Sequence, residues 1–349
     1  MKFKNVKEKI KFINSLDNEN NQTILNSISI LSRLAKDKNV GVKEALARQL
    51  VTFDSDEVEN ILYDMLSDKN RMIRLEALDS LSIGRHDTTM DKVGSMIERE
   101  GYLIRMYAVL TLFDVITNAY GLNEKAYDKY KGIIDKSFHL EKNLRVLSAY
   151  YQNEYYLNQE TGLQLLKSLY FNALETEEYS LIWTVLHIFK EIRNKRNYKE
   201  IQQIVECKKE KLLPIQKIFV DDMQAEKVPY KILVLDMDNT FLSHVVALML
   251  TSKFSKEDLV INTAGIDTGI LRSEDIKLFC ERNHIFHPEE LCSKRITSVY
   301  AYDYIICLNT VLNQDMYSND KTLYYADIDE ADDDCLISLC EEIKVKILG

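Results

Sequence analysis

Proline and glycine are scarce in this chain: its 349 residues include only 3 Pro and 10 Gly. Both residues interrupt helices, so their scarcity predicts a helix-rich chain with short connections. No apolar run approaches the ~20 residues that a membrane-spanning helix needs, and we expect no membrane association. With 46% apolar and 29% charged residues, the composition is that of a soluble globular protein, and the length favours two domains.

Cysteine is present without a recognisable pattern. None of the six cysteines forms a C-x-x-C pair, and the basic N-terminus has no apolar segment behind it, so no secretion signal is expected. We therefore expect free thiols and a cytoplasmic protein.

Excess positive charge is also lacking. Residues 231–349 hold 11 Lys and Arg against 21 Asp and Glu, so the whole net charge of −10 lies in the C-terminal third. An acidic domain beside a neutral one is a poor partner for a polyanion, and we expect no nucleic-acid binding.

What the first part of the chain does contain is a repeat of 31 residues. The tripeptide Asp-Lys-Asn at 37–39 recurs at 68–70, and an apolar–basic pair occurs at 42–43, 73–74 and 104–105. Asp and Asn favour helix starts, and the residues that follow place an apolar stripe on one helical face. A period near 30 fits a two-helix unit that must stack on its neighbours to bury that stripe.

This pattern resembles HEAT repeats, whose second helix often opens with an apolar–Arg pair after an Asp-containing turn. A fourth copy begins near 144, and helical patterns continue to 225, so we expect an all-α solenoid over residues 1–225. Such arrays expose an extended surface for a protein partner. The basic residues Lys43, Arg74 and Arg105 are expected to pair with carboxylates of neighbouring repeats. The sequence specifies no oligomeric state.

The pattern changes at Pro229, where helical continuation ends. Short apolar runs at 232–235, 259–261, 304–308 and 323–325 then alternate with amphipathic stretches at 243–253, 273–283 and 332–342. This alternation predicts a small doubly wound α/β domain with a parallel sheet over residues 230–349. Ligands of such sheets bind at the carboxyl ends of the strands, where Asp236, Asp238, Thr263, Asn309 and the acids of 327–334 fall.

The order of the segments after Pro229 resembles a low-molecular-weight protein tyrosine phosphatase, a fold shared with one class of arsenate reductases. The resemblance rests on the strand and loop at 232–243, the Asn-Thr-Ala-Gly segment at 262–265, read as a turn after the second strand, and the segments at 276–285, 293–297 and 302–308.

The departures from that family indicate an inactive pocket. The resemblance implies a nucleophilic Cys and an Arg six positions later, but this chain has Asp236 and Leu242 there, and Asp238 replaces a loop glycine. Asp329 is the nearest match to the family's general acid. We therefore expect no catalysis and no cofactor from the pocket residues, which are Asp236, Asp238, Asn239, Thr240, Leu242, Ser243 and Asp329.

A second interpretation stays open, because Asp-x-Asp-x-Thr after an apolar strand resembles the nucleophile loop of haloacid-dehalogenase-type phosphohydrolases. Asp236 would attack phosphorus, Asp238 would act as acid and base, and Thr263 and Lys294 would complete the site. Mg²⁺ would be held by a set of carboxylates, namely Asp236, Asp238, Asp327 and Asp332. The acids near 327–334 also suit the N-terminus of a helix. The interpretation that the sequence favours is a protein-binding adaptor with an inactive phosphatase-like domain.

Overall fold

The structure, a computed structural model, describes residues 3–18, 21–51, 55–83, 87–120, 124–253, 259–266, 269–287, 291, 302–310, 322–330 and 332–348. Two compact units share the chain, residues 1–163 and 164–349, and the division falls within one helix. None of the helices in the described ranges is long and apolar enough to cross a membrane.

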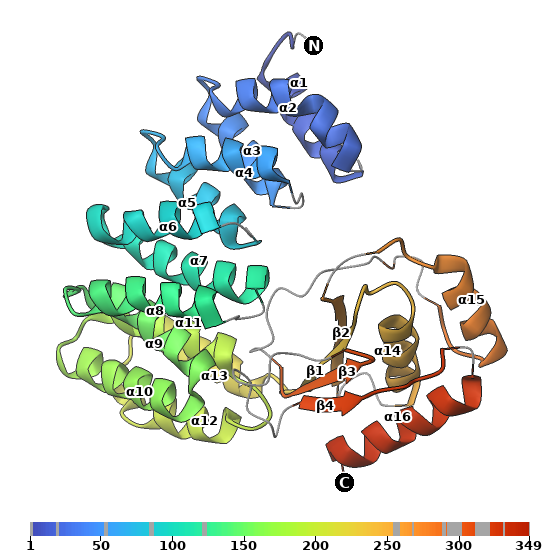
Figure 1. The fold of residues 1–349 in the computed structure, drawn as a ribbon. Coiled ribbons are helices and arrows are strands. Elements are labelled where there is room, and N and C mark those ends of the chain that lie inside the picture. Colours follow the sequence, from blue (N-terminus) through green and yellow to red (C-terminus); the bar gives the residue numbers. More distant parts are fainter. Residues whose placement is uncertain are drawn as a thin grey trace. The chain divides into compact units, whose positions relative to one another are not determined.

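The first unit is an array of helical pairs (Figure 1). Odd-numbered helices pack on the next odd-numbered helix and even-numbered helices on the next even-numbered one, so the array has two layers, as in a solenoid. Its helices are α1 (Val6–Asn14), α2 (Asn21–Ala35), α3 (Val40–Leu50), α4 (Asp56–Met65), α5 (Arg71–Ser80), α6 (Asp87–Arg99), α7 (Tyr102–Tyr120), α8 (Glu124–Phe138) and α9 (Leu144–Leu157), and α10 (Gln159–Glu175) leads into the second unit.

Ion pairs join successive repeats of the array, as the sequence predicts for Lys43, Arg74 and Arg105. The pairs are Lys9–Asp37, Lys43–Asp68, Arg74–Glu100 and Arg105–Glu141. The basic residues are therefore neutralised within the array, which leaves no ladder of unpaired cations for phosphate among these positions.

The repeated Asp-Lys-Asn tripeptide explains how one carboxylate serves two purposes. Asp68 pairs with the Lys43 ammonium and also accepts the N–H of Asn70 at 2.8 Å. The Asn70 side chain in turn accepts the N–H of Met72 and caps α5. Burial alone would raise the pKa of Asp68, but these hydrogen bonds lower it overall. Helix initiation and repeat-to-repeat attachment thus share one motif.

The second unit contains helices on both sides of the linker at Pro229 in sequence and, among the described residues, a four-stranded parallel sheet. The helices before the sheet are α11 (Tyr179–Ile192), α12 (Tyr198–Glu206) and α13 (Pro214–Ala225). The strands are β1 (Tyr230–Asp236), β2 (Leu259–Gly265), β3 (Tyr304–Leu308) and β4 (Thr322–Tyr325), in the order β2-β1-β3-β4. The order reverses between β1 and β3, which makes the carboxyl ends of these two strands the expected ligand position.

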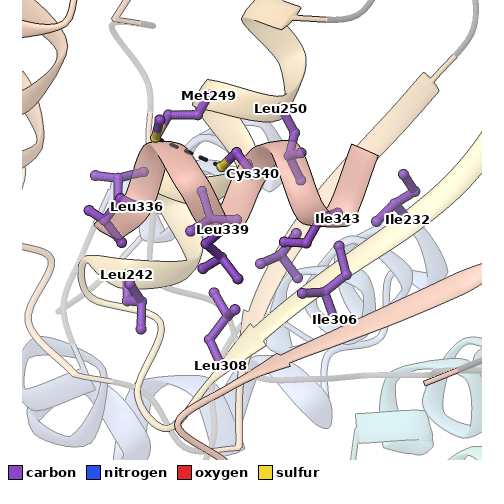
Figure 2. Close-up of a cluster of buried hydrophobic side chains, with 14 of the residues drawn as sticks. Ile232, Leu242, Met249, Leu250, Ile306, Leu308, Leu336, Leu339, Cys340 and Ile343 are labelled. Atoms are coloured by element: carbon purple, nitrogen blue, oxygen red, sulfur yellow. Dashed lines mark hydrogen bonds between the residues drawn. The ribbon is translucent and has the colours of Figure 1, made fainter. Parts of the chain in front are cut away.

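Helices α14 (Leu242–Lys253), α15 (Ser273–Arg282) and α16 (Asp333–Leu348) complete the unit and share one core with the sheet. Figure 2 shows Leu339 and Ile343 of α16 directed toward Leu308 and Ile306 of β3, with α14 alongside. The intervening residues of β1 and β3 are buried on the opposite face, as in a parallel sheet covered on both sides.

The structure corrects the ends of two predicted elements, β2 and α16. The sequence places a turn at 262–265, but β2 continues to Gly265, because its parallel pairing with β1 runs on to the pair Asp236–Gly265. The other strands and helices predicted after Pro229 are present, but α16 continues to Leu348, beyond its predicted end at 342. The segment at 293–297, on which part of the phosphatase resemblance rests, lies outside the described residues, as do Cys292 and Lys294.

Candidate functional site

The loop between β1 and α14 is built around a buried carboxylate. The Asp236 side chain is only 4% exposed. Its Oδ1 accepts the N–H of Asn239 at 2.6 Å, and its Oδ2 accepts the N–H of Ser243 at 2.8 Å. The first N–H groups of a helix lack partners within the helix. Asp236 therefore supplies from within the chain the negative charge that such a terminus attracts.

Burial raises the pKa of Asp236, whereas the two N–H donors and the Ser243 hydroxyl act in the opposite direction. Both carboxylate oxygens are committed to the loop itself. A nucleophile needs an oxygen directed at an incoming phosphorus atom, so this arrangement favours a structural role for Asp236 over the attack that the second interpretation assigns to it.

Asn239 fixes the path of the loop. Its φ of 53° lies in the left-handed region, which Asn tolerates better than most residues. Its side-chain N–H donates to the Ser243 hydroxyl at 2.8 Å, and its backbone carbonyl oxygen lies 3.1 Å from His244 Nε2. His244 Nδ1 lies 3.4 Å from the Thr263 hydroxyl. The residue predicted at the end of β2 thus contacts this loop through a buried histidine.

Asp238 and Thr240 form a second, more exposed turn. The backbone N–H and the hydroxyl of Thr240 both donate to Asp238 Oδ1, at 3.3 and 2.9 Å. Leu242 is buried in the core of the sheet and α14 instead of facing the loop. At the position where the resemblance implies an arginine, the side chain therefore cannot contact an anion at the loop.

A segment after β2 packs closely over the loop. The N–H of Gly269 donates to the Asp238 carbonyl at 2.9 Å, and the N–H of Arg272 donates to the Thr240 carbonyl at 3.1 Å. A Cβ added to Gly269 would lie 2.5 Å from Thr240 Cγ2. A side chain at position 269 would therefore force the Thr240 side chain to shift.

Arg272 is a cation beside the 236–243 loop that the sequence alone did not indicate. Its guanidinium lies 4.5 Å from the centre of the Phe241 ring and pairs with Asp275 at 2.8 Å and Glu330 at 3.0 Å. No spacing in the sequence links Arg272 to Glu330, because 58 positions separate the two residues. The guanidinium is already shared between two carboxylates.

The acids between β4 and α16 serve the start of that helix. Asp332 Oδ1 accepts the N–H groups of Asp334 and Cys335 at 3.0 and 3.2 Å, and the Asp329 carbonyl accepts the N–H of Asp332. Asp327 has a φ of 55° and forms the turn that leaves β4. The expectation that these acids suit a helix N-terminus is confirmed for Asp332.

The carboxylates of the metal interpretation are not gathered into one ligand set. Within the described ranges, no group of three or more His, Cys, Asp or Glu side chains is arranged to hold a metal ion. Asp236 and Asp332 each bind backbone N–H groups instead.

Asp303 is a second buried carboxylate, at the opposite end of the sheet, that the sequence analysis did not single out. Its Oδ1 accepts the N–H of Lys195 at 3.1 Å, and its Oδ2 accepts the N–H of Lys231 at 2.8 Å. Burial raises the pKa of Asp303, and these two N–H groups oppose the change. The residue ties the turn after α11 to the start of β1.

No known family model matches this chain, and no curated protein matches it. One structure that it resembles is a homology model of the full-length AP-3 complex in an intermediate open conformation, with 15% sequence identity and a TM-score of 0.42. The match covers 62% of this chain, which spans only 40% of the matched chain. A likeness of this size carries no argument about function, which rests on the residues themselves.

Proposed function

We propose that this chain is a protein-binding adaptor whose helical array supplies the binding surface and whose α/β part performs no catalysis. The observation that carries the proposal is a stripe of exposed apolar side chains on the array. Val40, Met72 and Tyr102 are 40%, 46% and 36% exposed, and each lies in the first turn of α3, α5 or α7.

The stripe repeats with the fold. The three helices pack successively in one layer, so the same turn of each repeat presents a large apolar group. Single exposed apolar residues are ordinary, but a recurring set along a solenoid matches the extended surfaces that these arrays use for binding. The Arg145 guanidinium lies over the Tyr102 ring, 5.3 Å from the ring centre. Tyrosine and arginine are both enriched at interface hot spots.

The non-catalytic assignment of the α/β part rests on the 236–243 loop. Asp236 stands where the resemblance implies a thiolate, both of its oxygens bind backbone N–H groups, and Leu242 is buried. A phosphate dianion approaching this loop meets a carboxylate at its centre. We keep the low-molecular-weight phosphatase resemblance as part of the proposal, with the four parallel strands and the switch point between β1 and β3 in its support.

Site-specific photo-crosslinking tests the binding surface. A photoreactive residue at position 72 should form discrete adducts with a partner protein in cells, and the changes Val40→Glu and Tyr102→Glu should reduce them. Position 64 on α4 is the control, since Asp64 is exposed but lies in the other layer of the array. Adducts that are equally frequent at 64 and 72, or insensitive to the stripe changes, would reject the proposed surface.

A phosphatase assay with and without Mg²⁺ tests the non-catalytic assignment. We expect no hydrolysis of p-nitrophenyl phosphate or of a phosphotyrosine peptide above a no-enzyme control. Turnover that depends on Mg²⁺ and disappears in Asp236→Asn would establish the metal-dependent phosphohydrolase instead.

A further inference from the structure

A pocket of about 370 Å³ lies in the second unit, near the amino end of β1 and so at the opposite end of that strand from the 236–243 loop. Its walls come from the turn after α11, from α12, and from the end of α13 with the linker to β1. Pockets that hold small molecules begin at about 300 Å³. Neither the array nor the candidate loop contributes a lining residue.

The charged groups of this pocket are mostly cationic. Arg193, Lys195 and Lys227 line it together with one carboxylate, Glu226. Glu226 is shared, because it binds Arg193 at 3.1 Å and also Lys190 at 2.6 Å. Glu226 is thus the one carboxylate among the lining residues, and its charge is divided between two cations, which favours an anionic occupant beside Arg193 and Lys195.

Arg193 is the most deeply placed of these cations, with a side chain only 10% exposed. Its burial lowers the pKa of the guanidinium, an effect larger than the opposing one of Glu226. Its one carboxylate partner in the pocket, Glu226, is shared with Lys190, so a bound anion could serve as a second partner of the guanidinium.

Lys195 adds a cation without a carboxylate partner among the described residues. Its ammonium donates to the Val228 carbonyl at 3.3 Å and lies 5.9 and 5.5 Å from the ring centres of Tyr198 and Tyr230. A carbonyl and two rings orient the ammonium but do not neutralise it.

The remaining walls combine apolar and aromatic side chains with two glutamines, Gln202 and Gln224. Tyr198, Ile201, Met223 and Val228 line the pocket, so a bare inorganic ion would leave most of it unfilled. We propose that this pocket binds a small organic dianion with an aromatic or apolar body, the anionic group held by Arg193 and Lys195. This site is independent of the proposed adaptor function.

Isothermal titration calorimetry of the full chain with phenyl phosphate, benzoate and phenol tests the assignment, because these probes share a ring and differ in charge. We expect saturable binding of phenyl phosphate, weaker binding of benzoate and none of phenol. Lys195→Met and Arg193→Met should each weaken phenyl phosphate binding by about tenfold, the value of one charged hydrogen bond. Glu226→Gln should strengthen it.

Lys199→Met is the matched control. Lys199 is an exposed lysine of α12 that does not line the pocket, so its loss changes the net charge equally and should leave binding unchanged. Circular dichroism checks that each variant is folded. The proposal is overturned by an absence of saturable phenyl phosphate binding up to about 10 mM, by equal binding of phenol, or by unchanged affinity for phenyl phosphate in folded Lys195→Met and Arg193→Met.

Discussion

The geometry of the ion pairs between repeats predicts that they differ in strength. Arg105 binds Glu141 through two parallel hydrogen bonds of 2.8 and 2.9 Å, whereas Arg74 meets Glu100 through one contact of 3.4 Å. The changes Glu141→Gln and Glu100→Gln are chemically identical, so their comparison isolates the geometry.

The magnitude follows from burial. The Glu141 side chain is 7% exposed and that of Arg105 is 22% exposed. Breaking a fully buried pair costs about 3–5 kcal/mol, and an exposed pair is worth at most about 1 kcal/mol. We expect Glu141→Gln to lower the free energy of unfolding by about 2 kcal/mol, and Glu100→Gln by less than about 1 kcal/mol.

The pH dependence gives a second readout. Burial alone would raise the pKa of Glu141, but the hydrogen bonds from Arg105 and from the N–H of Asn143 lower it below its ordinary value of 4.5. The folded state therefore binds this proton less tightly than the unfolded state. The stabilisation is present above about pH 4.5 and is lost as the pH falls through the lower, folded pKa. The difference between wild type and Glu141→Gln should shrink over that range.

Urea unfolding followed by far-UV circular dichroism measures these differences. The only tryptophan, Trp183, lies in the second unit, so Glu141→Gln should shift the circular-dichroism transition more than the fluorescence transition. Equal stability of Glu141→Gln and wild type at pH 7, or a larger loss in Glu100→Gln, would refute the reasoning.

Three further changes test the second unit by the same unfolding measurement. Leu339→Ala removes a buried side chain from the core in Figure 2 and should cost about 2–5 kcal/mol, and a loss under about 1 kcal/mol would contradict the packing. Asp303→Ala leaves two N–H donors without their acceptor and should cost about 2–4 kcal/mol, with an unchanged midpoint as the contrary result. Gly269→Ala should cost about 1–3 kcal/mol, because its Cβ would clash with Thr240 Cγ2. Adding Thr240→Ser to this variant removes Cγ2 and keeps the hydroxyl, so it should recover much of the lost stability. No recovery would show that the strain has another source.

The fold was largely readable from the sequence where one period dominates. The 31-residue repeat fixes which residues cap helices and which basic side chains meet a neighbouring carboxylate, because both depend on short, repeated distances along the chain. The strands after Pro229 were readable for a similar reason, since each is an apolar run bounded by polar residues. The end of β2 was missed because it is set by pairing with β1, which residues 262–265 alone do not reveal.

The candidate loop was located from the sequence, but its internal geometry was not. A carboxylate after a buried strand can face a ligand or turn back onto the helix that follows, and the residues near Asp236 permit both. The Asp236 orientation depends on the left-handed turn at Asn239. Arg272 and Asp303 were missed because their partners lie far away in sequence.

The hydrogen bonds of Asp303 determine where a fragment that contains the sheet should begin if it is expressed alone. A fragment that starts at residue 230 keeps the carboxylate and the Lys231 donor but discards the Lys195 donor. One oxygen of a buried acid would then lose its hydrogen bond. A fragment that begins before α11 should therefore be soluble and unfold cooperatively. A fragment that begins just after Pro229 should be prone to aggregation.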